Sequence, residues 1–318
     1  MGGDHGTPGG GGRDVVAGLD IGGTGTSVVL LDGERVVARE HAATPVRDGG
    51  AAMAAAAAGL VRSALAAAPG TRLVGAGVGA AGVVDAASGT VVAASDSFRD
   101  WAGFPLAAEL GAALGVPVRV ENDVNAFALG EARLGAARGL DDVLAIMLGT
   151  GVGGAFVLSG GLYRGPTGAA GEIGHVAGFG DLSCTCGGRG HLETLASGRA
   201  VARSYGRTAG VTVAGAREVA DLARAGDPHA RGAFAAAADA VGRAAVLVAS
   251  LLDVTDVVVG GGVAAAWDLL ADGIEAGVRR EPPVSGAAVR VRPSALGRDA
   301  VALGAASIAP AAALSLAG

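Results

Sequence analysis

Asp20–Ser27 reads D-I-G-G-T-G-T-S, and Ala145–Leu158 reads A-I-M-L-G-T-G-V-G-G-A-F-V-L. Each stretch places a glycine–threonine–glycine turn between two apolar runs, and the second run ends at a polar residue followed by glycine. Val15–Leu19, Val28–Leu31 and Arg35–Glu40 are the strands predicted around the first turn. Two copies of one hairpin in a single chain predict two related α/β domains.

Both turns have the composition of a phosphate-binding loop. Two glycines followed by a threonine let backbone N–H groups and a hydroxyl approach a phosphate, so two such turns predict domains that close on one nucleotide. The expected phosphate contacts are Gly23, Thr24, Gly149, Thr150 and Gly151. Asp20, at a strand end, is expected to bind Mg²⁺ through water. No helix follows the first glycines, which excludes a dinucleotide fold. The first turn, taken alone, could also be an ordinary hairpin turn.

A third glycine cluster, V-V-V-G-G-G-V, occupies Val257–Val263 and precedes the helix-like A-A-A-W-D-L-L. A helix N-terminus after glycines favours bound phosphate or adenosine. We therefore expect Gly260, Gly261 and Gly262 to lie at the nucleotide.

Composition excludes several classes of protein. The chain has 318 residues, and all 24 of its basic residues are arginine. A Walker-type loop, a protein-kinase site and a Schiff-base mechanism each need lysine. The net charge of −6 argues against nucleic acid as a partner. No uncharged apolar run approaches the roughly 18 residues of a membrane span, and no association with a membrane is expected.

Residues 1–12 are expected to be a disordered leader. Two cysteines one residue apart are poor disulfide partners and favour a reducing cytoplasm.

A polar cluster, E-N-D-V-N at Glu121–Asn125, follows the predicted strand Val116–Val120 and opens the predicted helix Val124–Ala137. α/β proteins usually place their sites at such strand ends. Asn122 and Asp123 are therefore candidate site residues. Asp123 could alternatively be only the N-cap of the helix.

Gly171–Glu193, G-E-I-G-H-V-A-G-F-G-D-L-S-C-T-C-G-G-R-G-H-L-E, contains both cysteines of the chain. Two imidazoles and two thiolates are the ligands that a closed tetrahedral Zn²⁺ site requires, and we expect them to be His175, Cys184, Cys186 and His191. The alternative is a pair of buried reduced thiols with unrelated histidines. The remaining histidines, His5, His41 and His229, are expected to lie on the surface.

The five motifs at Asp20, Glu121, Leu148, Gly171 and Cys184, in this order, resemble those of the ROK family of sugar kinases and regulators. The resemblance runs from about Val15 to the C-terminus. It implies a two-domain actin-like ATPase (ribonuclease H-like) α/β fold with an interdomain cleft and a zinc-binding loop at 171–193. The expected domains are a small one, 13–124 plus 300–318, and a large one, 125–299.

The resemblance also implies an ATP-dependent, glucokinase-like hexose kinase that phosphorylates the 6-hydroxyl. Asp123 resembles the catalytic base, and Asn122, Glu172, His175 and Glu193 resemble the residues that hold the sugar. ATP, Mg²⁺ and a structural Zn²⁺ are the implied cofactors, and the family is commonly dimeric or tetrameric. The alternatives are a sugar-sensing transcriptional regulator, for which only 14 residues precede Val15, and an inactive sugar-binding protein.

Three positions depart from the family pattern. His191 stands where the family has a third cysteine, and we expect it to bind zinc equally well. Ala81 replaces the proline of a G-x-P-G turn near the sugar. Asp96 replaces asparagine, and its added carboxylate predicts a preference for a cationic amino sugar such as kanosamine.

Overall fold

The computed structural model describes residues 12–95 and 97–310, and the chain forms two compact units. The first unit runs to Glu121 and resumes at Ala305, and the second is continuous from Asn122 to Gly304. The predicted boundaries, 124/125 and 299/300, differ by a few residues, so Asn122 and Asp123 belong to the second unit. The predicted leader lies, except for Gly12, outside the described residues, and so does Asp96.

The first unit is built on a five-stranded sheet with the order β3-β2-β1-β4-β7. Its strands are β1 (Arg13–Ile21), β2 (Thr26–Asp32), β3 (Arg35–Ala42), β4 (Thr71–Ala80) and β7 (Val118–Asn122). The two glycine-flanked runs form the antiparallel pair β1–β2, as predicted, and β4 is parallel to β1. A small hairpin, β5 (Val83–Asp85) and β6 (Thr90–Ala93), was not predicted.

Helices α1 (Gly50–Ala67) and α2 (Leu106–Leu114) complete the first unit. The alanines of α1 recur at helical spacing, and its buried stripe packs against Leu19, Val28 and Leu30 of the sheet. Gly77 of β4 lies directly against the backbone of Ala305, where a methyl group would overlap the carbonyl oxygen. The last described segment of the chain is thus part of the packing of the first unit.

The second unit repeats the same sheet order, β10-β9-β8-β11-β12. Its strands are β8 (Val143–Leu148), β9 (Val152–Leu158), β10 (Gly161–Tyr163), β11 (Asp256–Gly260) and β12 (Arg290–Pro293). As in the first unit, the glycine hairpin is antiparallel and the next strand is parallel to its first arm. The topology therefore agrees with the predicted duplication.

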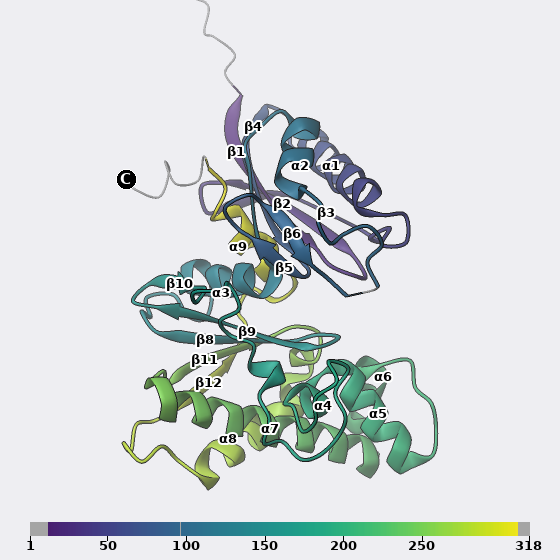
Figure 1. Cartoon of the computed structure of the whole chain (residues 1–318), viewed down its shortest axis with the longest axis vertical. Coiled ribbons are helices and arrows are strands. Elements are labelled where there is room, and N and C mark those ends of the chain that lie inside the picture. The colour runs from purple at the N-terminus through teal and green to yellow at the C-terminus, as the bar shows by residue number, and fades with distance from the viewer. Residues whose placement is uncertain (1–11, 96, 311–318) are drawn as a thin grey trace, which may run out of the picture. The chain divides into compact units, whose positions relative to one another are not determined.

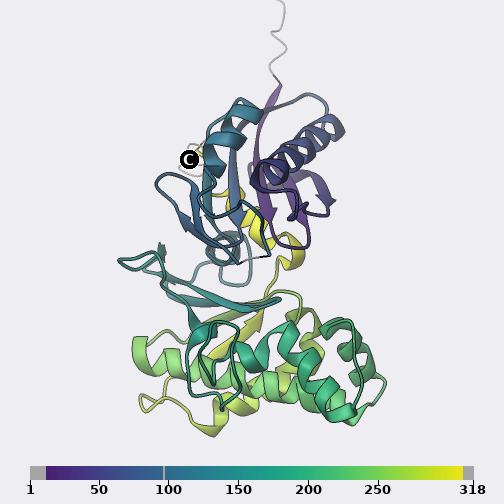
Figure 2. The ribbon, with the colours of Figure 1, turned by 45° about the vertical axis from the view of Figure 1, so that its right-hand side comes forward.

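The helices of the second unit are α3 (Asp123–Leu134), α4 (Glu193–Ala196), α5 (Gly198–Ala209), α6 (Ala216–Arg224), α7 (Pro228–Leu252), α8 (Trp267–Arg280) and α9 (Ala300–Ala306), the last of which reaches into the first unit. Figures 1 and 2 show α7 and α8 side by side below the sheet. Gly242 and Gly277 allow this close approach, because a side chain at either would overlap the backbone of the other helix.

Two local predictions were wrong. The sequence Leu195–Arg203 predicts one continuous helix, but the structure interrupts it at Ser197, whose hydroxyl accepts from Ala200 N and caps α5. The helix after the third glycine cluster does not start there: a 3₁₀ turn, Ala264–Ala266, comes first, and α8 begins at Trp267.

By length and composition alone, α1 and α7 could each cross a membrane. Core helices of globular proteins meet the same criterion. Met53 and Val61 of α1 and Phe234 and Val241 of α7 are buried in the cores of their own units, and packing accounts for their apolar composition.

Candidate active site

The strand end at Asn122 and the start of α3 position Asp123. Asn122 is the N-cap: its Oδ1 accepts from Val124 N at 2.9 Å and from Asn125 N at 3.1 Å. Asp123 is therefore not the cap, and it occupies the first position of the helix. Its Oδ1 accepts from Asn122 Nδ2 and from Val124 N, both at 3.0 Å.

Burial raises the pKa of Asp123 from 3.8 to about 6, although its hydrogen bonds act in the opposite direction. A carboxyl group with a pKa just below neutrality is ionised at pH 7 and still basic enough to take a proton. The environment of Asp123 thus has the property that a general base requires.

The first glycine turn closes with a hydrogen bond from Gly22 N to Gly25 O at 3.1 Å. Gly23 and Thr24 are exposed on it, and Asp20 is the last residue but one of β1, with its Oδ1 close to Gly22. Nearby, Ala81 stands in the turn that lacks the family's proline. That turn is nevertheless fixed, since Trp101 Nε1 donates to Ala81 O at 2.9 Å and Ala81 N donates to Ile21 O.

The second turn is one residue shorter, because Gly149 N donates to Gly151 O at 2.9 Å. Thr24 and Thr150 each stand two residues before the second strand of their hairpin, so the extra residue of the first turn lies before its threonine. Two other segments meet the second turn. Val263 N of the third glycine cluster donates to Leu148 O at 3.0 Å, and Gly198 N at the start of α5 donates to Gly149 O at 2.8 Å.

The structure thus brings the second turn and the third glycine cluster together, as a shared nucleotide site requires. Gly261 has a φ of +88° and lies so close to Leu148 that a side chain would overlap its backbone. Sequence reasoning missed Arg199, whose Nε donates to Thr150 O at 3.0 Å. The adjacent N-terminus of α5 adds a positive dipole end at the turn.

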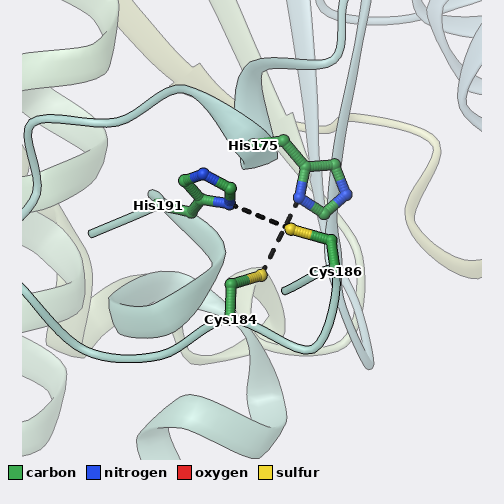
Figure 3. A group of neighbouring side chains, drawn as sticks. All are labelled: His175, Cys184, Cys186 and His191. Atoms are coloured by element: carbon green, nitrogen blue, oxygen red, sulfur yellow. Dashed lines mark hydrogen bonds between the residues drawn. The ribbon is translucent and has the colours of Figure 1, made fainter. Parts of the chain in front are cut away.

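The four predicted metal ligands converge in the second unit (Figure 3). Their ligand atoms all lie within 4.8 Å of one another, although the residues come from a 3₁₀ turn, a loop and a position two residues before α4. Cys184 Sγ lies 3.8 Å from His175 Nδ1, and Cys186 Sγ lies 3.3 Å from His191 Nδ1. Both thiols are free, and the predicted cluster is therefore confirmed as a geometric group.

These spacings fit a tetrahedral Zn²⁺. Bond lengths of about 2.3 Å to sulfur and 2.0–2.1 Å to nitrogen give ligand–ligand edges of roughly 3.4–3.8 Å. Burial raises the pKa of the Cys184 thiol, and the neighbouring Cys186 and Glu193 raise it further. A cation among these groups would reverse that effect by stabilising the thiolates.

The loop between the ligands is held by several independent contacts. Gly188 must be glycine, because a side chain there would overlap the His191 ring. Phe179 N donates to Gly190 O at 2.8 Å, and α7 supports the same region. Arg243 donates to Gly178 O at 2.8 Å and lies 5.0 Å above the Phe179 ring. The ligand geometry thus rests on packing as well as on any bound ion.

The two carboxylates of the loop differ. Glu172 is exposed beside His175. Glu193 is largely buried, and its Oε2 accepts from Val152 N, the residue that follows the second turn, at 3.0 Å. Its Oε1 faces Cys184 Sγ at 3.9 Å and Arg199 at 3.8 Å. Glu193 therefore links the metal cluster to the second glycine turn, a connection that the sequence did not reveal.

Comparison with known proteins matches this arrangement. The sequence profile of the ROK family covers residues 16–312. A glucokinase from Streptomyces coelicolor is 34% identical over 283 residues, which are 84% of this chain and 87% of that protein. The crystal structure of a ROK family glucokinase from Streptomyces griseus with glucose and AMPPNP has a TM-score of 0.79 and 34% identity, over 93% of this chain and 99% of that one.

Regulators occur among the relatives as well. A xylose repressor from Caldicellulosiruptor bescii is 36% identical over 130 residues, 41% of this chain and 32% of the repressor. The glucokinases match over a much larger part of both sequences. On the profile, the shared topology and the ordered set of motifs, the chain belongs to the ROK family.

Proposed function

We propose that this chain transfers the γ-phosphate of ATP to the 6-hydroxyl of a hexose, with Asp123 as the general base. That it is an ATP-dependent hexose kinase follows from its family and its glucokinase relatives. The hydroxyl, the base and the sugar contacts are our proposal. The observation that carries it is Asp123, which stands at a helix start with Asn122 as the cap and has a pKa of about 6.

Phosphoryl transfer through a loose transition state needs positioning and charge neutralisation more than a strong nucleophile. Asp123 accepts the proton of the attacking hydroxyl, and Asn122 Nδ2 orients its carboxylate. The backbone N–H groups and hydroxyls of the two turns, with Thr24 and Thr150, contact the phosphates. Asp20 would hold Mg²⁺ through water, and the ion would supply neutralisation of the phosphate charge.

Asn122, Glu172, His175 and Glu193 are proposed to hold the sugar hydroxyls, for which carboxylates are suitable acceptors. The ligands that would hold Zn²⁺ are His175, Cys184, Cys186 and His191. With four protein ligands the ion would have no open coordination position and would supply structure only. On this proposal, the metal cluster fixes His175 and Glu193, and the proton is taken by Asp123.

The sugar itself is tested with a substrate panel. Coupled release of ADP would be measured with glucose, mannose, fructose, allose, N-acetylmannosamine and kanosamine. We propose glucose or a close relative as substrate. A kanosamine preference that disappears in Asp96→Asn would support the charge-pairing hypothesis, and an unchanged ratio of kcat/KM would end it.

No turnover with any sugar would refute the kinase proposal and favour a binding protein or regulator. Size-exclusion chromatography with light scattering tests the expected homodimer or homotetramer. We also propose a cytoplasmic location, because Cys184 and Cys186 are free and suited to a metal that reducing conditions preserve.

A further inference from the structure

Three polar side chains form a row across the sheet of the first unit. Asp20 of β1 pairs with Ser27 of β2, and Ser27 pairs with His41 of β3. Residues directly opposite one another on neighbouring strands share a face, so the three side chains lie on the same side of the sheet. The row stands at the strand ends that adjoin the first glycine turn.

His41 is exposed, as predicted for a surface histidine, and it also has a defined partner. Its Nδ1 lies 3.1 Å from Ser27 Oγ. When the Ser27 hydroxyl donates to Nδ1, the ring proton resides on Nε2, because the bond at one imidazole nitrogen sets the tautomer at the other. In this tautomer Nε2 is a donor.

The imidazole lies against the turn itself. A methyl group added at Gly25 would come within 2.5 Å of His41 Cε1 and 3.1 Å of its Nε2. Any other residue at position 25 would therefore displace the ring. Elsewhere on the turn, a methyl group at Gly23 would come within 3.2 Å of Phe98 Cζ. His41 is thus a polar side chain in contact range of this turn, as is Asp20 at Gly22, whereas the neighbour of Gly23 is the apolar Phe98.

We propose that His41 is a nucleotide-binding residue, whose Nε2 donates a hydrogen bond to a phosphate oxygen of MgATP held by the first turn. This inference rests on the proposed function. The turn offers a phosphate only its backbone N–H groups and the Thr24 hydroxyl, and the chain contains no lysine. His41 adds a side-chain donor at one end of the row, while Asp20 at the other end would hold the metal of the nucleotide.

The test compares His41→Ala, His41→Gln and Ser27→Ala with wild type. Binding of MgATP is measured by titration calorimetry without sugar, and KM for ATP and for hexose by coupled ADP release. Loss of a hydrogen bond to a charged phosphate predicts about a 5- to 20-fold weaker Kd and higher KM for ATP in His41→Ala. The KM for hexose stays within about twofold of wild type.

Glutamine retains an N–H donor, so His41→Gln should recover part of the affinity. Ser27→Ala removes only the partner that orients the ring, and its loss should be about two- to threefold. His229→Ala, an exposed histidine of the second unit, is the matched control and should bind MgATP like wild type.

Gly25→Ala tests the contact itself. If Gly25→Ala acts by displacing His41, it weakens MgATP binding when His41 is present. In the His41→Ala background it causes no further loss of affinity. An unchanged Kd for MgATP in His41→Ala, or an equal rise in the KM for hexose, would overturn the proposal. A wild type that binds MgATP and phosphorylates no sugar would refute the kinase proposal alone, because the binding comparison still decides the role of His41.

Discussion

Asp123→Asn should make the protein both more stable and inactive. The amide keeps the shape of the side chain and an oxygen that can accept from Val124 N. It removes a charge that the folded protein disfavours, since burial raises the pKa of Asp123 from 3.8 to about 6. At about 1.36 kcal/mol per pKa unit, ionised Asp123 costs the folded state at most about 3 kcal/mol.

The direction in which stability changes with pH follows from proton binding to Asp123. Between pH 3.8 and about 6 the folded protein retains a proton on Asp123 that the unfolded chain has released, so wild-type stability falls as the pH rises through this window. Above about pH 6 the wild-type protein has lost the full stability that protonated Asp123 gives it. Asparagine does not ionise, and the variant should therefore gain up to about 3 kcal/mol at pH 7.5 and roughly half of that at pH 5.

Urea unfolding at both pH values measures the gain, and coupled ADP release measures kcat, which should fall about 10²- to 10⁴-fold. Glu109→Gln is the matched control, because Glu109 is an exposed carboxylate in the first turn of α2. Loss of its interaction with the helix dipole should lower the free energy of unfolding by about 0.3–1 kcal/mol, whereas Asp123→Asn should raise it. A kcat within tenfold of wild type would show that Asp123 is not the base, and a stability gain independent of pH would refute the effect of burial.

In the wild type, kcat at saturating MgATP and hexose should rise with pH through about 6 and then level off, because the base must be ionised; a flat profile between pH 5 and 8 would contradict this. His191→Ala should lose bound zinc and melt at a lower temperature, whereas His191→Cys should keep about one equivalent by elemental analysis. Elemental analysis that finds no zinc in the wild-type protein would contradict this prediction. Glu131→Ala should lower the free energy of unfolding by about 3 kcal/mol or more, because buried Glu131 accepts from Ser294 Oγ and from the backbone of Ala136, Ala295 and Leu296. Ser294→Ala, which removes one of these donors, should cost about 1 kcal/mol in the same urea titration.

The elements that sequence could predict are those with a local cause. Glycine turns between apolar runs determined both hairpins, and spacing alone indicated the four ligands of the metal cluster. The two sheets follow from the repeated hairpin. Helix α2 was missed because alanine and glycine are frequent throughout this chain, so its composition does not stand out.

The contacts that sequence could not predict join residues far apart in the chain. Neither Glu193 with Val152 nor Arg199 with Thr150 leaves a local pattern. The pairing of Ser27 with His41 was not predictable either. A register carried from the turn, where Asp32 pairs with Arg35, would place Ser27 opposite Glu40, and only the irregularity between Leu30 and Leu31 shifts the pairing to His41. Asn122 and Asp123 were both candidates, and only the hydrogen bonds show that Asn122 is the cap and Asp123 the first residue of the helix.

The contact between Gly77 and Ala305 has a consequence for synthesis of the protein. The first unit begins the chain but is completed only by residues from Ala305 onward, whereas the second unit is continuous. A domain usually folds as soon as it emerges from the ribosome, N-terminal first. In this chain the order is reversed: the residues of the second unit all precede Ala305, so it can fold while the first unit still waits for Ala305 to emerge.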